Sequence, residues 1–236
     1  TTDYASGMVG YWTFGNKITE GTDTATTIYD QSAGSDDDLT SSTIAAPFAG
    51  HTATPTGAIH KTDRSVFGGS SMYFDGTNDR LTITASSDFN FGSSDFTIEW
   101  WAYNDLSSSF TGNGIGWEQW SGSGGIQAAY LNSSANMPIT LVAQDGTNYT
   151  KTLTLGSRLM QQWLHLAIGR FENTLYVMLD GVIDEIGACP ATEAFGSSSL
   201  APVIGLVDGS AYSIGYLDEM RVTSGISRYK KSIERF

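Results

Sequence analysis

FTIEWWAY, residues 96–103, is the stretch of this sequence that decides the fold. Apolar residues fill its even positions, while its odd positions hold Thr97, Glu99, Trp101 and Tyr103. Alternate residues of a β-strand point to opposite faces, so the two sets lie on different sides of one strand. Because both faces carry bulky side chains, we predict a central strand that is covered on both sides.

Short alternating runs bounded by Gly, Ser, Asn and Asp recur along the chain, and helical periodicity is nearly absent. Residues 163–170 and 174–179 predict an antiparallel hairpin, which the turn Asp180-Gly181 extends into a meander. About a dozen strands are too many for one open sheet, so we predict an all-β fold of two packed sheets. The remaining strands are predicted at 9–14, 71–74, 81–85, 138–143, 151–155, 202–206 and 212–223.

One domain is predicted for the 236 residues, because 40% of them are hydrophobic and a large β-sandwich holds a chain of this length. We place it at residues 8–236, after an N-terminal tail at 1–7. Residues 15–70 are rich in Thr, Ser, Ala, Gly and Asp, and they predict a long loop excursion with one short strand near Leu39.

The net charge of the chain indicates which classes of partner it can bind. The 25 acidic and 12 basic residues give a net charge of −13, which repels phosphate backbones and anionic lipids. We therefore expect neither nucleic acid nor a membrane surface as a partner. The same carboxylates suit calcium, or they simply keep an acidic surface soluble. Cys189 is the only cysteine, which excludes an internal disulfide and a thiolate zinc cluster.

A glycosidase needs two carboxylates placed across the scissile bond. No strand here carries acidic residues at alternate positions, since Glu99 has no acidic neighbour at 97 or 101. The pairs Asp184-Glu185 and Asp218-Glu219 are adjacent and are expected to project to opposite faces. No histidine lies in a GxSxG or HExxH context. We therefore predict no catalytic residues and a domain that is not an enzyme.

The turn Asp75-Gly76-Thr77-Asn78-Asp79 offers oxygen side chains at alternating positions between two predicted strands. One tight loop of this kind wraps a calcium ion when backbone carbonyls complete the shell. An ordinary hairpin turn, in which Asp and Asn cap their own backbone, has the same spacing. The sequence leaves both interpretations open.

Aromatic residues outside the strongest strands are candidates for binding sugars, whose C–H faces stack on Trp and Tyr rings. Four of them lie in surroundings rich in Gly, Ser and Asn, where we expect exposure: Trp117, Trp120, Tyr130 and Tyr149. They are the predicted ligand-binding residues, although each ring taken singly also fits a core position.

The order and spacing of several stretches resemble a laminin-G-like domain of the concanavalin A-like lectin/glucanase superfamily. These stretches are MVGYWTF, DQSAGSDDDLT, GGSSMYFDGTNDRLTI, FNFGSSDFTIEWWAY, WLHLAIGRFENTLYVMLDGV and IGYLDEMRVTSGISRY. The resemblance implies a jelly-roll sandwich of two antiparallel sheets, in which a concave sheet faces a glycan in some relatives. It also implies a structural calcium ion at Asp75, Asn78 and Asp79, with Asp218 and, as a lesser contributor, Asp30.

The superfamily includes lectins, adhesion modules, structural domains and hydrolases, so the resemblance implies no single activity. The acidic catalytic strand of its glucanase branch does not appear here. The C-terminal DEMRVTSGISRY resembles bacteriophage virion proteins, which implies a tail-fibre, receptor-binding or capsid-decorating role on a virion or at a cell surface.

Three functions stay open at this point. The first is a glycan-binding or adhesive domain whose partner is a surface glycan. The second is a structural module that contacts virion protein or copies of itself in a homo-oligomer or larger assembly. The third is a glycoside hydrolase.

Overall fold

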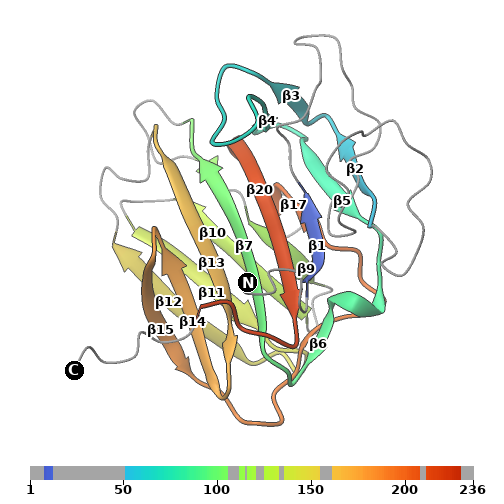
Figure 1. Cartoon of the computed structure of the whole chain (residues 1–236), viewed down its shortest axis with the longest axis vertical. Coiled ribbons are helices and arrows are strands. Elements are labelled where there is room, and N and C mark those ends of the chain that lie inside the picture. The colour runs from blue at the N-terminus through green and yellow to red at the C-terminus, as the bar shows by residue number, and fades with distance from the viewer. Residues whose placement is uncertain are drawn as a thin grey trace, which may run out of the picture.

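In the computed structural model of this protein, the described residues form two eight-stranded sheets packed face to face, with two small ribbons beside them (Figure 1). The structure describes residues 8–12, 51–105, 112–114, 116–120, 125–132, 136–154, 161–207 and 211–229. The predicted all-β antiparallel sandwich is confirmed. Among the described residues the only helical element is the 3-10 turn η1, Ser87–Phe89.

The front sheet faces the viewer in Figure 1 and is centred on β7 (Phe96–Tyr103), which pairs with β13 on one side and β20 on the other. Its order is β15-β14-β13-β7-β20-β4-β3, and β1 also pairs with β20. The bounds of these strands are β1 Met8–Trp12, β3 Ile59–Lys61, β4 Ser71–Asp75, β13 Trp163–Phe171, β14 Thr174–Leu179, β15 Val182–Ala188 and β20 Ile214–Ser224.

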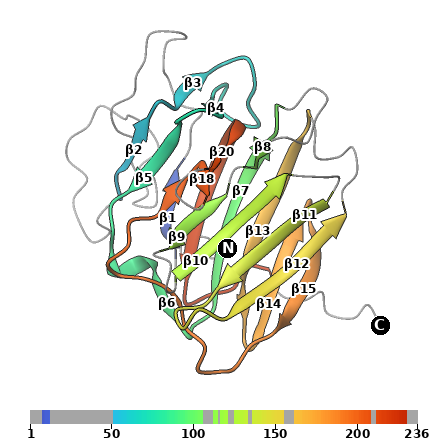
Figure 2. The same cartoon turned by 180° about the vertical axis from the view of Figure 1, so that it is seen from behind.

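The back sheet comes forward in Figure 2 and has the order β12-β11-β10-β9-β17-β5-β2, with β8 paired to β10. Its strands are β2 Ala53–Thr56, β5 Arg80–Ile83, β8 Gly112–Asn113, β9 Trp117–Trp120, β10 Gly125–Asn132, β11 Asn136–Val142, β12 Asn148–Thr154 and β17 Val203–Ile204. Two small ribbons join β6 (Asn90–Gly92) to β16 (Phe195–Gly196) and β18 (Leu206–Val207) to β19 (Ala211–Tyr212).

The core lies between the sheets and follows the alternation of β7. Phe96, Ile98 and Trp100 belong to the buried cluster, together with Trp117 and Ile126 from the back sheet. Each large apolar side chain buried in this way stabilises the fold by about 1.5–3 kcal/mol. The odd residues of β7 face outward, so the outer face of the front sheet carries the polar and aromatic groups described below.

A β-bulge in β20 sets which side chains reach that outer face. Asp218 pairs with Trp101 and Arg221 pairs with Glu99, so two residues of β20 stand opposite one residue of β7. Glu219, inside the bulge, has φ = 49°, which costs a non-glycine residue about 1–2 kcal/mol. Without the extra residue, simple alternation turns Arg221 toward the core. The bulge therefore brings its guanidinium to the outer face, beside Glu99.

The sequence-based boundaries are close for most strands, and the predicted strand 174–179 matches β14. Residues 15–70 are not one long loop, because β2 and β3 lie inside this range. These strands are three and four residues long and rich in small and polar residues, so they show no hydrophobic alternation. The predicted strand near Leu39 lies outside the described residues, and the domain limits 8–236 stay a prediction.

None of the described segments forms a helix with the length and apolar character that a membrane crossing needs.

Candidate binding site

The structure contradicts the expected exposure of Trp117. This side chain is fully buried in β9, where its ring lies 5.5 Å from that of Phe89. The glycines and serines around it belong to the segments that flank a strand, and the strand itself turns Trp117 into the core. A ring with no exposed surface cannot stack on a ligand, so Trp117 is a core residue.

The predicted aromatic residues whose side chains the structure describes, Trp117, Trp120 and Tyr149, do not form one platform. Trp120 is half-buried at the end of β9, on the face opposite Trp117 because three positions separate them. Tyr130 belongs to β10, where its backbone pairs with Ile139, and its side chain lies outside the described residues.

Tyr149 leads to an open hollow. It lies on β12, packs its ring against Phe195 with centroids 6.1 Å apart, and donates its hydroxyl to Glu193 Oε2 at 2.8 Å. Glu193 is 8% exposed and lines the hollow. Of the four predicted rings, Tyr149 is therefore the one that the described contacts connect to a cavity.

We call this cavity the end hollow. It has a volume of about 460 Å³ and lies between the turn after β11 and the loop that follows β15. Its lining consists of Gln144, Asp145, Pro190, Thr192, Glu193 and Ala194. Carboxylate, amide and hydroxyl groups dominate this lining, while Pro190 and Ala194 add small apolar surfaces.

The polar groups of the end hollow are held in place by the fold. Gln144 donates its side-chain amide to Asn90 Oδ1 at 2.8 Å and to the carbonyl of Gly196 at 2.6 Å. The backbone amide of Thr147 donates to Asp145 Oδ1 at 2.8 Å, and this bond lowers the pKa of Asp145 below its ordinary value. Asp145 is therefore an ionised acceptor on a fixed turn.

Arg170 fixes the opposite wall. Its side chain is 1% exposed and points inward from β13. The guanidinium donates to the carbonyls of Glu193 at 2.7 Å and Pro190 at 3.2 Å, and Nε donates to the carbonyl of Glu172 at 2.6 Å. A buried cation needs such acceptors to offset its desolvation, and here they hold the loop 190–193 against β13.

A second cavity, the side hollow, lies on the outer face of the front sheet and has a volume of about 180 Å³. Its lining consists of Phe171, Glu172, Thr174, Tyr176, Ile183 and Glu185. The hydroxyl of Tyr176 is fixed by Thr97 Oγ1 at 2.7 Å and by Ser227 Oγ at 3.1 Å. Its ring lies over Gly169, where a Cβ atom would come within 2.6 Å of that hydroxyl. The absence of a side chain at 169 thus lets the tyrosine form the floor.

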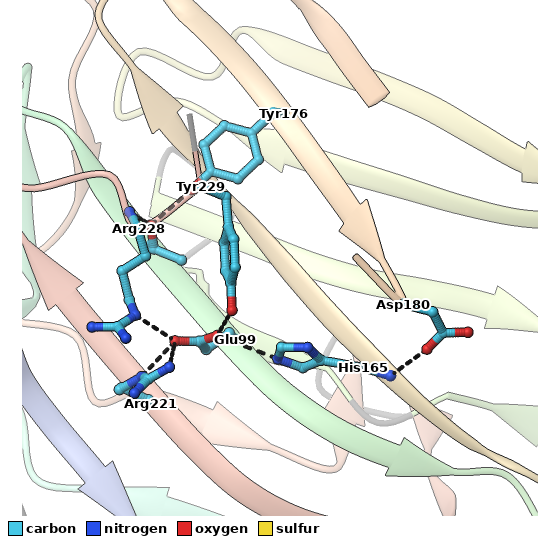
Figure 3. Close-up of polar contacts among 8 residues, drawn as sticks. Glu99, His165, Tyr176, Asp180, Arg221, Arg228 and Tyr229 are labelled. Carbon is cyan, nitrogen blue, oxygen red and sulfur yellow. Dashed lines mark hydrogen bonds and ion pairs between the residues drawn. The ribbon is translucent and has the colours of Figure 1, made fainter. Parts of the chain in front are cut away.

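The Glu99 cluster, which comprises Glu99, His165, Arg221, Arg228 and Tyr229, occupies the centre of the same face (Figure 3). Glu99 is 2% exposed and accepts hydrogen bonds from Arg221 and Tyr229. Arg228 Nε lies 3.0 Å from Oε1, and His165 Nε2 lies 3.3 Å from Oε2. Burial raises the pKa of Glu99, but the His165 hydrogen bond and the two arginines outweigh it, so the pKa lies below its ordinary value.

Residues 225–229, which follow β20, cover this cluster. Figure 1 shows the dark red segment crossing in front of β7 and β13. The backbone amide of Gly225 donates to the carbonyl of Asp95 at 2.7 Å, and that of Arg228 donates to Thr97 Oγ1 at 3.0 Å. Both oxygens of Glu99 are therefore engaged by the chain itself and are closed off from a substrate.

Comparison with known proteins gives the family. The model of the concanavalin A-like lectin/glucanase superfamily matches residues 75–226. The chain belongs to this superfamily. The predicted family is thereby confirmed, whereas the bacteriophage context has no support in these comparisons.

Solved structures agree with this superfamily fold. The binding domain of Paraclostridial Mosquitocidal Protein 1 has a TM-score of 0.63 and 13% identity, over 92% of this chain and 49% of its own. A botulinum neurotoxin type C structure has a TM-score of 0.64 and 10% identity, over 94% of this chain and 49% of its own. The botulinum neurotoxin DC binding domain in complex with SialylT has a TM-score of 0.61 and 7% identity, over 92% of this chain and 47% of its own. The chain thus spans about half the length of these domains. A search of curated protein sequences finds no match.

The calcium site that the superfamily resemblance implies does not assemble from the described residues. Asp79 is 3% exposed and accepts the backbone amide of Asp75 at 2.7 Å, and Asp75 accepts that of Thr77 at 2.8 Å. These are the bonds of a self-capped turn. Asp218 lies elsewhere, under the loop 66–67, whose two amides it accepts at 2.9 and 3.1 Å.

No group of three or more His, Cys, Asp or Glu side chains is placed to hold a metal ion within the part of the chain that the structure describes. Asn78 is exposed on the same turn, and Asp30 lies outside the described residues. Calcium binding by Asp75, Asn78, Asp79, Asp218 and Asp30 stays a prediction from the sequence resemblance alone, because the described carboxylates of Asp75, Asp79 and Asp218 already accept backbone amides.

Proposed function

We propose that this chain is a non-catalytic carbohydrate-binding domain and that the end hollow contacts the sugar. The observation that carries the proposal is an open, oxygen-rich cavity whose acceptors are fixed before any ligand arrives. Sugar hydroxyls donate well to carboxylates such as Asp145 and Glu193, and the apolar faces of Pro190 and Ala194 suit sugar C–H groups. Fixed acceptors reduce the entropy that is lost on binding.

The similar structures support a glycan as the partner. Botulinum neurotoxin type C depends, for its passage into cells, on interaction with two ganglioside molecules, and the DC binding domain was solved with SialylT. Sequence identity is 10% and 7%, and this chain corresponds to about half of each domain. These relatives therefore support the class of ligand and leave the contact site to be argued from this chain.

Two carboxylates of this fold do not suit the role of a general acid. A glycosidase acid must stay protonated at working pH, which requires a raised pKa. The pKa values of Asp145 and Glu99 are both lowered, the first by the Thr147 amide and the second by its cationic and hydrogen-bonding neighbours. Glu99, on the central strand, is in addition covered by residues 225–229.

Binding is tested by a glycan array followed by calorimetry on the sugars that bind. We expect Asp145→Asn, which keeps the turn and removes the charged acceptor, to weaken affinity about threefold to tenfold. Thr192→Val is expected to weaken it by a similar factor. The matched control is Phe67→Ala, an exposed aromatic residue that does not line the end hollow. A folded protein that binds nothing on the array contradicts the proposal.

Catalysis is tested by prolonged incubation with laminarin, agar, alginate and peptidoglycan, with reducing-sugar detection. We expect no release above a heat-denatured control. Release that disappears in Glu193→Gln would make the end hollow an active site and overturn the proposal.

The domain's location follows from the same function. A glycan-binding domain acts where it meets a surface, and the resemblance of DEMRVTSGISRY to virion proteins supports a place on a bacteriophage particle or outside a cell. Light scattering of the purified chain, alone and with shell protein from the same source, tests the competing structural role. Glycan binding by a monomer with no affinity for shell protein is the expected result.

A further inference from the structure

Arg170 holds backbone that borders both the end hollow and the side hollow. The guanidinium of Arg170 bonds the carbonyl of Glu172, beside the side hollow, through Nε and that of Glu193, beside the end hollow, through Nη1. The backbone amide of Cys189 also donates to the carbonyl of Asn173 at 2.8 Å, at the turn between β13 and β14. One buried side chain thus fixes backbone beside both cavities, on the turn that precedes β14 and on the loop that follows β15.

From this arrangement we infer that the two hollows are subsites of one extended site, and that its ligand is an uncharged oligosaccharide. The inference rests on the proposed function and deepens it, because it names the class of glycan. A chain of sugars that reaches from one hollow to the other fills both subsites at once.

The lining charges select against acidic sugars. Asp145 and Glu193 line the end hollow, Glu172 and Glu185 line the side hollow, and no Lys or Arg is among the described residues of either lining. A carboxylated sugar in either subsite would meet like charges within a few ångströms, and none of the described lining residues is a cation that could pair with it. The net charge of −13 adds a long-range repulsion of the same sign. Uncharged hydroxyls, by contrast, donate to each of these carboxylates.

The sizes of the hollows favour more than one sugar unit. The side hollow, at about 180 Å³, is smaller than the cavities that usually enclose a drug-sized ligand, so it suits a single ring. Phe171, which is half-buried, borders this hollow with a ring that suits the C–H side of a sugar, while the buried Tyr176 forms the floor beneath it. The described lining of the end hollow contains no aromatic residue and supplies hydrogen bonds instead. Each subsite alone is therefore weak, and a linked pair of sugars gains from a high effective concentration.

The test is an array of gluco-, galacto- and N-acetylglucosamine oligosaccharides of one to six units, printed with and without a terminal sialic acid. We expect affinity to rise about tenfold or more between one and three units, and the sialylated versions to bind more weakly. Phe171→Ala should remove the gain with chain length while leaving the affinity for the shortest bound sugar unchanged. Asp145→Asn should lower affinity at every length. Phe67→Ala is the control, and a melting curve for each variant reports folding.

The outcomes separate the two proposals. No binding to any printed sugar overturns the proposed function and this inference together. Binding that does not change with chain length, or that Phe171→Ala leaves untouched, overturns the extended site and leaves the end hollow as a single site. Stronger binding of the sialylated chains overturns the uncharged ligand class.

Discussion

Glu99 and Glu193 are both buried carboxylates, but they differ in how completely the protein itself satisfies their hydrogen-bonding oxygens. In the Glu99 cluster both oxygens are bonded to side chains of the protein, and residues 225–229 close over them. Glu193 receives one hydroxyl, from Tyr149, and borders an open hollow whose walls Arg170 fixes from behind. A buried acid stabilises the fold where the chain satisfies it completely, and it is available to a ligand where a cavity remains in front of it.

The sharpest test of this difference is Glu99→Gln. The amide leaves Arg221 and Arg228 without their carboxylate, and removal of one partner from a buried ion pair costs about 3–5 kcal/mol of unfolding free energy. We expect a cost near the lower end of this range, because the side chains of Arg221 and Arg228 are 25% and 16% exposed and water can solvate them. Urea unfolding measures the cost. Glu193→Gln is the matched control, with a cost under about 1 kcal/mol because its amide oxygen still accepts from Tyr149. Equal costs would refute the distinction.

The loss of unfolding free energy in Glu99→Gln should depend on pH. The folded-state pKa of Glu99 lies below the ordinary 4.5, so its stabilising contribution is complete above about pH 4.5. It is lost as the pH falls from there through the folded-state value, because the protonated acid no longer pairs with the arginines. The difference between wild type and Glu99→Gln should therefore shrink between pH 5 and pH 3, as measured by urea midpoints. A difference that stays constant over this range would assign the effect to packing.

Arg170→Met tests the other region. Methionine keeps most of the buried volume but leaves the carbonyls of Glu172, Pro190 and Glu193 without their donor. The expected cost is about 3 kcal/mol, since each buried acceptor left unpaired costs about 1–3 kcal/mol and some will find water. Glycan affinity, measured by calorimetry below the melting temperature, should fall with it.

The control is Arg228→Met, which breaks the Glu99 cluster at an arginine whose side chain is 16% exposed, against 1% for Arg170. It should lower stability and leave glycan affinity unchanged. If both variants weaken binding to the same degree, the loss reflects general instability and the end hollow has no special dependence on Arg170.

The sequence was sufficient for features that depend on local alternation. The odd and even positions of β7 lie where the pattern predicts, because the two faces of a strand are fixed by its own periodicity. The burial of Arg170 could also have been predicted. Arg170 lies an even number of residues from Leu164, Leu166 and Ile168 in the same strand, so its side chain must lie on their buried face. A cation at such a position predicts an enclosed set of acceptors.

Features that depend on distant pairing could not be predicted. Alternation alone places Arg221 on the core side of β20, and only the bulge opposite β7 reverses it. The burial of Trp117 depends on which elements lie across from β9, which its Gly- and Ser-rich flanks do not reveal. The end hollow joins a turn at 144–145 to a loop at 190–194, segments that no local pattern connects. Its residues were therefore missed, apart from the neighbouring Tyr149.

The smallest expected effect concerns calcium. A structural ion held at a hundred times its dissociation constant adds about 2.7 kcal/mol, which raises the melting temperature of a chain of this size by about 5–10 °C. The Asp75 and Asp79 carboxylates already accept backbone amides, and Asp218 caps a different loop. We therefore expect EDTA and added calcium to give the same melting temperature. A shift of several degrees that Asp75→Ala abolishes would restore the calcium site, and would show that the turn rearranges when it binds the ion.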